Sequence, residues 1–250
     1  MGTTLGQDRV VAIVGFMGAG KSTAARSAAQ ALGSGVIDVD DELERREGRT
    51  IERIFAEDGE GRFRQLEERL ILELLQSAAT RVLALGGGAL GSGRVRQALG
   101  EHLVVWVDVD VDTAWARCRG TARPLAADRE AFVRMHRARE PVYAAAADVI
   151  VPQERSVRMA EVLAALKGLP AGVTVLWAMS ASGDYPAYIG SGLLDADAPF
   201  WPATVLGRRF LVTDGTAGRL YADRLGPLDG RVAIMPGEQS KTIAHAEIVW

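Results

Sequence analysis

A glycine-rich stretch near the start of the chain carries residues suited to binding phosphate groups. Its spacing GxxxxGK[ST] is met by Gly15, Gly20, Lys21 and Ser22. In such a loop, backbone N–H groups at a helix N-terminus face phosphate oxygens and the serine hydroxyl reaches Mg²⁺. Lys21 is one of three lysines in a chain that otherwise uses arginine, which indicates a need for a compact ammonium group. The alternative is an ordinary tight turn.

Two aspartates follow a short strand predicted at residues 36–38. On an extended strand end, Asp38 and Asp40 would point to one side, into the crevice where open α/β sheets bind ligands. This favours Asp38 as support for Mg²⁺ and Asp40 as the acid that orients or deprotonates a substrate hydroxyl. The alternative is that Asp40 or Asp41 caps the helix predicted from about residue 41.

Arg64 lies early in a predicted amphipathic helix, where ion pairing and binding of an anionic ligand are both open. Its possible partners at helical spacing are Glu60, Glu67 and Glu68. Further along, three consecutive glycines at 86–88 follow a predicted strand that begins at Arg81. Ordering consecutive glycines costs conformational entropy, which favours a turn facing a ligand over a plain linker.

The densest basic region extends from residue 112 to 143. Its arginines are Arg117, Arg119, Arg123, Arg129, Arg134, Arg137 and Arg139. Residues 121–128, TARPLAAD, show little apolar periodicity and suit a mobile lid that closes over phosphates. The alternative for about half of these arginines is a solvated surface.

Alternating strands and helices must position these groups. Apolar runs predict strands at 10–14, 36–38, 81–85, 102–109 and 148–151, the last being the final strand of the sheet. Helical spacing predicts helices at 23–32, from 41, within 50–77 with a division at Gly59 and Gly61, at 94–100 and at 156–166. This order indicates an α/β fold with a parallel sheet flanked by helices.

The composition limits the possible partners and compartment. The chain has 250 residues, 48% of them apolar, a net charge of −3 and one cysteine, Cys118. We therefore expect a soluble cytoplasmic protein with no disulfide and no nucleic-acid or membrane partner.

Residues from about 10 to 166 resemble the shikimate kinase family. The resemblance rests on the phosphate loop, IDVD at 37–40, IxxIFAxxGExxFRxLE at 51–67, LALGGGA at 83–89, ARPL at 122–125 and RxPxY at 139–143. It implies a three-layer P-loop NTPase fold with a lid like that of nucleoside monophosphate kinases. It also implies Mg²⁺-dependent transfer of the ATP γ-phosphate to the 3-hydroxyl of shikimate, in the chorismate pathway to aromatic amino acids.

The resemblance also implies a role for individual residues of a monomeric kinase domain, 1–166. Catalysis would use Lys21, Asp40 and Arg123. ATP would be held by Gly18, Ala19, Gly20, Lys21, Ser22, Thr23, Arg117 and Arg123. Shikimate would be held by Asp40, Arg64, Gly86, Gly87, Gly88 and Arg139, and Mg²⁺ by Ser22 and Asp38. A pair of arginines suits a carboxylate, and an aspartate suits a ring hydroxyl.

A linker is predicted at 167–172 because of its glycine and proline content. Residues 173–250 resemble the start of 3-dehydroquinate synthase through YPAYIGSGLL, LVTD and PGEQSKT. The resemblance implies an incomplete Rossmann-like α/β segment, with Asp214, Glu238 and Lys241 on an NAD site that only a complete domain would form. The family's metal ligands would follow Trp250, and His102, His136 and His245 form no ligand cluster. We expect no synthase activity, marginal order of this segment and a bifunctional protein cut short.

Three other functions remain open. One is another small-molecule P-loop kinase, for gluconate or a nucleoside monophosphate. The second is an ATP-binding module without catalysis, and the third is a GTP switch, which the absence of any asparagine disfavours. Measuring ATP consumption with and without shikimate separates the kinase from the binding modules.

Overall fold

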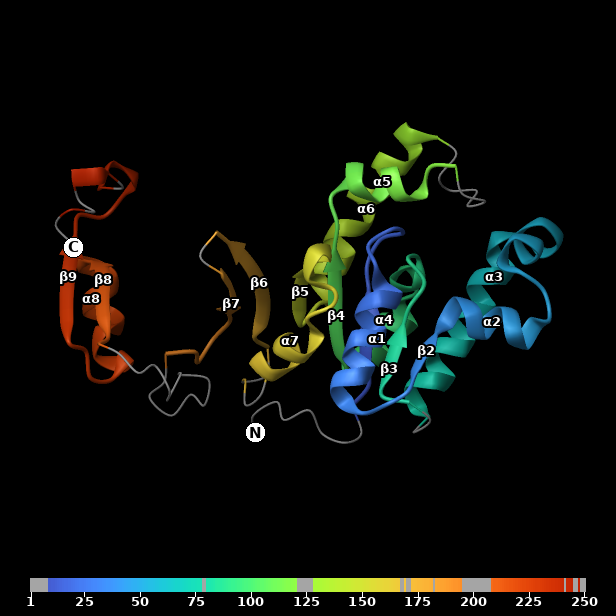
Figure 1. The fold of residues 1–250 in the computed structure, drawn as a ribbon, viewed down its shortest axis with the longest axis horizontal. Helices are drawn as coiled ribbons and strands as arrows, with labels where there is room; N and C mark the ends of the chain where they lie inside the picture. Colours follow the sequence, from blue (N-terminus) through green and yellow to red (C-terminus); the bar gives the residue numbers. More distant parts are fainter. Residues whose placement is uncertain are drawn as a thin grey trace.

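The fold is built on one seven-stranded sheet (Figure 1). In this computed structural model, the described residues are 9–77, 80–120, 128–166, 169, 172–181, 183–194, 208–240, 242–244 and 247. The strand order is β2-β3-β1-β4-β5-β6-β7. Neighbours pair in parallel from β2 to β6, and β7 pairs antiparallel with β6.

The five strands predicted within residues 10–166 are all present, as β1 (Val11–Val14), β2 (Val36–Asp38), β3 (Val82–Ala84), β4 (Leu103–Asp108) and β5 (Val149–Pro152). Two more strands of the sheet, β6 (Thr174–Ser180) and β7 (Gly183–Ile189), lie beyond the predicted linker. The central strands β1 and β3 are buried throughout, because helices flank a parallel sheet on its faces. A strand that is buried on both faces needs apolar side chains at every position, which explains the unbroken apolar sequences of β1 and β3.

Helices flank the sheet as the sequence predicts, which gives the α/β P-loop architecture. They are α1 (Lys21–Leu32), α2 (Val39–Glu47), α3 (Ile51–Gln76), α4 (Gly93–Leu99), α5 (Val111–Cys118), α6 (Arg129–Ala146) and α7 (Met159–Ala165). Four alanines on α1 are buried, and this helix packs beside α7 and over β1 and β3. Small side chains let it approach the sheet closely enough to place its first turn at the end of β1.

The predicted division of α3 is confirmed at Gly59. Its φ of 81° and ψ of 168° break the helix there, in a region of backbone space that only glycine occupies readily. Gly61 lies inside the helix that follows and makes no break of its own. Thr50 caps the first part, its hydroxyl accepting a hydrogen bond from the N–H of Arg53 at 3.3 Å.

The start of α2 differs from the prediction. The helix begins at Val39, two residues early, and its cap is Asp38, whose carboxylate accepts from the Asp40 N–H at 3.2 Å. The predicted caps Asp40 and Asp41 were therefore wrong. Asp40 lies in the first turn of α2. The prediction that Asp38 and Asp40 both lie on an extended strand end and point to one side therefore does not hold for Asp40.

The prediction that residues 148–151 form the last strand of the sheet was also wrong. The sheet continues through β6 and β7, which lie beyond the predicted linker. The predicted helix at 156–166 begins only at Met159, after a 3-10 turn, η3 (Gln153–Arg155). Apolar periodicity identifies single strands and helices but gives no information on which sheet a strand joins.

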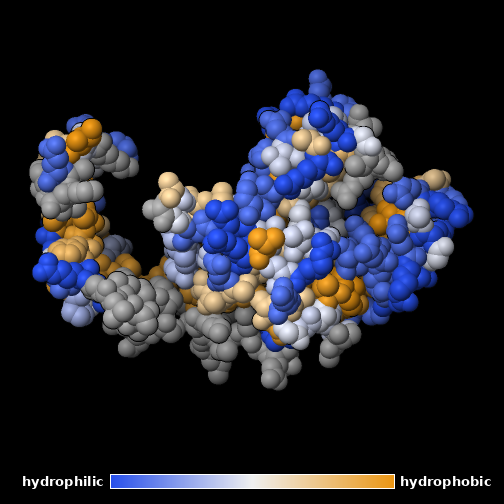
Figure 2. Space-filling view, in the orientation of Figure 1, coloured by the Kyte–Doolittle hydropathy of each residue, from blue (hydrophilic) through white to orange (hydrophobic). Residues whose placement is uncertain are grey.

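A second, two-stranded parallel sheet follows. It comprises β8 (Phe210–Asp214) and β9 (Gly230–Ile234), with α8 (Gly215–Tyr221) and the 3-10 turn η4 (Ala222–Leu225) between them. Another 3-10 turn, η5, spans Glu238–Ser240. No residue of α8 is buried, and large apolar side chains are exposed on this unit (Figure 2), including Phe210, Leu220 and Met235.

Candidate active site

The phosphate loop joins β1 to α1 and depends on glycine at three positions. Gly15, Gly18 and Gly20 have φ values of 146°, 79° and 90°. A Cβ on Gly15 would lie 2.5 Å from the carbonyl oxygen of Val107 on the neighbouring strand β4. The loop is thus held close to the sheet, and α1 begins with no acidic residue in its first turn. The N–H groups of a first helical turn and the positive end of the helix dipole favour an anion.

Lys21 and Ser22 open α1 and lie beside the end of β2. The Lys21 ammonium donates to the Phe16 carbonyl at 3.1 Å, across the loop. Ser22 Oγ donates to Asp38 Oδ2 at 2.8 Å. A hydroxyl beside a carboxylate is a set of hard oxygen donors, which fits Mg²⁺ that also keeps water and phosphate ligands. The two residues predicted to hold the metal therefore lie together.

Asp40 faces the glycine turn from α2. A Cβ on Gly86 would lie 2.9 Å from Asp40 Oδ1 and would overlap Glu67 Oε1. Both carboxylates therefore reach the turn after β3, and only glycine leaves them room. The close approach explains the first of the three glycines.

Arg64 is both ion-paired and directed at the site. Its Nη1 donates to Glu67 Oε2 at 2.6 Å and its Nη2 to Glu60 Oε1 at 3.2 Å. A Cβ on Gly88 would overlap its guanidinium group. Glu68, the third predicted partner, instead pairs with Arg94 at 2.8 Å. The ion-pair and ligand-facing interpretations of Arg64 are thus compatible.

Arg139 and Tyr143 reach the same turn from α6. A Cβ on Gly87 would lie 3.5 Å from Arg139 Nη1, and the guanidinium of Arg139 lies over the Phe16 ring, 5.6 Å from its centroid. Tyr143 Oη donates to the Gly87 carbonyl at 2.5 Å. Burial raises the pKa of Tyr143 to about 12, so its hydroxyl stays a donor at neutral pH.

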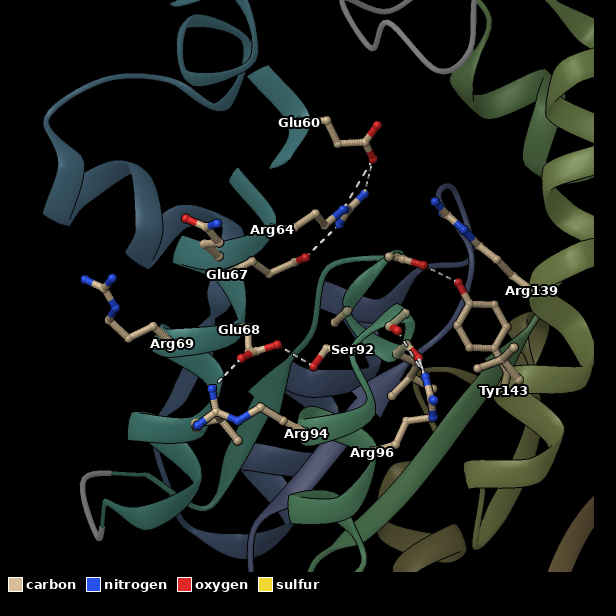
Figure 3. A pocket seen from close by; sticks show the side chains of 18 residues that line it. Glu60, Arg64, Glu67, Glu68, Arg69, Ser92, Arg94, Arg96, Arg139 and Tyr143 are labelled. Carbon is tan, nitrogen blue, oxygen red and sulfur yellow. Dashed lines mark hydrogen bonds and ion pairs between the residues drawn. The ribbon is translucent and has the colours of Figure 1, made fainter. Parts of the chain in front are cut away.

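Most of the charged residues described above, with the three glycines of the turn, line one cavity of about 680 Å³. Its wall combines the phosphate loop, the end of β2, α3, the glycine turn and α6 through Lys21, Ser22, Asp38, Asp40, Arg64, Gly86, Gly87, Gly88 and Arg139. A larger hollow of about 1060 Å³ adjoins it (Figure 3). Arg64 and Arg139 line both, and Figure 3 shows them reaching from opposite sides toward one opening.

The predicted nucleotide-binding arginines are only partly described. Arg117 Nη1, at the end of α5, donates to the Gly18 carbonyl at 2.8 Å, which places it against the phosphate loop. Arg123 and most of the predicted lid, residues 121–127, lie outside the described residues. So does Lys241, predicted for an NAD site. The other two residues of that prediction are described, and Asp214 caps α8 by accepting from Thr216 N at 2.7 Å.

Glu67 and Tyr143 contact the site although neither was predicted as a site residue, Glu67 having been named only as a possible ion-pair partner of Arg64. Glu67 is 2% exposed, and burial raises the pKa of its carboxyl group while Arg64 opposes the shift. Its place in the FRxLE block and the place of Tyr143 in RxPxY were the available signals. Burial could not be read from either, because helical spacing alone does not show what lies opposite.

The fold and the site define a P-loop phosphotransferase with an arginine-lined cavity for a small acidic acceptor. The family model for shikimate kinase matches residues 17–167. The shikimate kinase of Mycobacterium avium is 42% identical over 166 residues, covering 64% of this chain and 92% of the relative. That of Rhodococcus erythropolis is 40% identical over 141 residues, covering 55% and 83%. The chain belongs to the shikimate kinase family.

Solved structures agree with this membership. Shikimate kinase from Acinetobacter baumannii in complex with shikimate matches with a TM-score of 0.59 and 33% identity, over 63% of this chain and 92% of the other. The enzyme from Bacteroides thetaiotaomicron matches with a TM-score of 0.56 and 27% identity, over 62% and 98%.

Proposed function

We propose that the chain is an ATP-dependent kinase that phosphorylates the 3-hydroxyl of shikimate in the pathway to aromatic amino acids. The observation that supports this most directly is the shared cavity: the phosphate loop, Asp40, Arg64 and Arg139 line the same space. Membership of the shikimate kinase family and the likeness to a shikimate complex identify the acceptor.

The acceptor would be held by charge and shape together. Arg64 and Arg139 would bind the carboxylate of shikimate, because planar guanidinium groups match a carboxylate bidentately. The bare backbone of Gly86, Gly87 and Gly88 lets the ring approach the turn. Tyr143 and Glu67 hold that turn and Arg64 in place.

Transfer then needs a hydroxyl in line with the γ-phosphate. Asp40 would orient that hydroxyl and accept its proton. Lys21, and Arg123 from the lid, would stabilise negative charge on the transferring group. Ser22 and Asp38 would hold Mg²⁺, which neutralises phosphate charge when bound. The loop amides from Gly18 to Thr23 would bind the phosphates, and Arg117 would lie near the base.

The test is acceptor-dependent turnover. The 250-residue chain with Mg²⁺ and ATP should form ADP when shikimate is added, and far more slowly with gluconate or a nucleoside monophosphate. ADP formation that is independent of any acceptor, or binding of ATP without turnover, would favour the binding-module alternative.

We also propose that the chain combines two parts: a kinase domain that is monomeric and cytoplasmic, and a segment like the start of 3-dehydroquinate synthase within 173–250. The second part rests on the motifs quoted above, of which YPAYI lies in β7 of the seven-stranded sheet. In the described ranges no cluster of three or more histidine, cysteine or acidic side chains could hold a metal ion, and no helix there has the length and apolarity to cross a membrane. Neither NAD binding nor synthase turnover is expected, and an NAD titration of the full chain tests this.

A further inference from the structure

The hairpin formed by β6 and β7 is packed as a part of the kinase sheet. β6 pairs in parallel with β5, with Val149 opposite Val175 and Ile150 opposite Leu176. Val175 and Trp177 are buried, at 0% and 5% exposure, and Tyr188 Oη donates to the Ala165 carbonyl at the end of α7 at 3.2 Å. The hairpin covers β5, which would otherwise be an open edge with unpaired backbone groups.

One carboxylate of the hairpin contacts the turn between β5 and α7, residues 153–158. Asp184 Oδ1 accepts from Arg155 Nη2 at 3.1 Å, and its Oδ2 accepts from Arg155 Nε. Arg158 Nη1 lies 3.7 Å from Oδ2. The Asp184 side chain is 6% exposed, and hydrogen bonding by Arg155 lowers its pKa, so the carboxylate is charged at neutral pH.

The same turn is hydrogen-bonded to α1, the helix that follows the phosphate loop. Ser27 Oγ on α1 donates to the Val157 carbonyl at 2.7 Å and accepts from the Met159 N–H at 3.2 Å. A Cβ on Gly20, at the start of α1, would lie 3.8 Å from Ser156 Oγ. Val157 is exposed beside this contact. The turn therefore forms a wall directly next to the loop that binds phosphates.

We propose that the β6–β7 hairpin is a working part of the kinase, in which Asp184 positions the β5–α7 turn as a wall of the nucleotide site. The chain of contacts runs from Asp184 through Arg155 and Arg158 to the turn, and from the turn to α1. This rests on the proposed function, because it requires that the phosphate loop bind a nucleotide. Asp184 is a positioning residue and touches neither substrate.

The test uses the full 250-residue chain and the variant Asp184→Asn. The variant removes the negative charge that pairs with Arg155 and Arg158. Binding of Mg-ADP, measured by calorimetry, should weaken by about fivefold, because the ion pair that positions the turn is lost. The KM for ATP should rise in parallel while the KM for shikimate stays the same. Asp184→Glu should recover most of the affinity. Asp223→Asn, which removes an ion pair with Arg231 on the other sheet, serves as the matched control and should change nothing.

Two outcomes overturn the proposal. One is a fall in melting temperature with unchanged Mg-ADP affinity, which would make the hairpin only a structural edge. The other is an equal rise in both KM values. If Asp184→Asn does not fold, Arg158→Gln on a half-exposed side chain should show a smaller loss of Mg-ADP affinity, and no loss would reject the proposal. A wild-type chain that binds Mg-ADP without shikimate turnover would reject only the proposed function.

Discussion

At the scale of single residues, the site is a set of charges held by close backbone approach. Three glycines let two carboxylates and two guanidinium groups come within contact of one turn. A methyl group at Gly86 or Gly88 would displace Glu67 or Arg64. The positions of the charged groups therefore depend on the absence of a Cβ atom at these glycines as well as on the charges themselves.

Asp40→Asn should abolish transfer while keeping nucleotide binding. The amide cannot accept the hydroxyl proton, so kcat should fall by on the order of 10² to 10⁴. Mg-ADP affinity should be unchanged, since Asp40 faces the glycine turn and not the phosphate loop. Steady-state kinetics and calorimetry measure both. Asp112→Asn on the exposed surface of α5 is the control, and lost Mg-ADP affinity in the Asp40 variant would show that its role is misassigned.

Tyr143→Phe should loosen the glycine turn without removing a charge. It deletes the hydrogen bond to the Gly87 carbonyl, a loss of about 1 kcal/mol, so the KM for shikimate should rise by about fivefold. Because the pKa of Tyr143 is raised to about 12, this difference should not vary between about pH 6 and about pH 9. Tyr221→Phe on the exposed part of α8 is the control. An unchanged KM would mean that the glycine turn keeps its position without the hydrogen bond from Tyr143.

Glu67 should make the stability of the fold depend on pH. Burial raises its pKa above the ordinary 4.5, so the folded state favours the protonated form and loses that advantage as pH rises through the raised pKa. Glu67→Gln removes this component. Urea unfolding between about pH 5 and about pH 8 should therefore show the variant gaining stability relative to wild type as pH rises. A stability difference that does not change with pH would contradict a raised pKa of Glu67.

At the scale of elements, the break in α3 matters because it orients the helix that carries Arg64 and Glu67. Both parts of α3 line the cavity, with Ile51 and Phe55 before Gly59 and Arg64 and Glu67 after it. The break is set by one backbone conformation, with no Cβ contact within 4 Å at Gly59 or at Gly61. Space is therefore not the reason for glycine at either position.

Two alanine substitutions in α3 should have opposite effects. Gly59→Ala places a side chain at φ 81° and should destabilise the fold by about 1–3 kcal/mol. Gly61→Ala lies in regular helix and should stabilise it by about 0.5–1 kcal/mol. Chemical unfolding of both variants measures the signs. Equal effects would mean that the helix does not break at Gly59.

At the scale of the whole molecule, the second sheet contrasts with the first. The seven-stranded sheet has a continuous core, whereas β8, α8 and β9 leave large apolar groups in water. Such exposure on a small unit marks a contact surface or a tendency to associate.

We therefore expect the full chain to associate as its concentration rises, through this unit. Replacing the exposed side chains of Phe210 and Met235 by serine should reduce light scattering at high concentration, because it removes apolar surface. Turnover of the kinase should not change. Scattering that is unaffected by the double substitution would place the contact elsewhere.

The sequence by itself determined the class of fold, most elements and several of the charged residues and glycines that line the cavity. Glycine spacing, apolar runs and ordered motifs are local, and local patterns persist in the chain whatever packs against it. The tertiary structure alone decided that Glu67 and Tyr143 contact the site and that β6 and β7 extend the sheet beyond β5. These depend on which distant segments meet, and a strand has the same alternation of side chains whichever neighbour it pairs with.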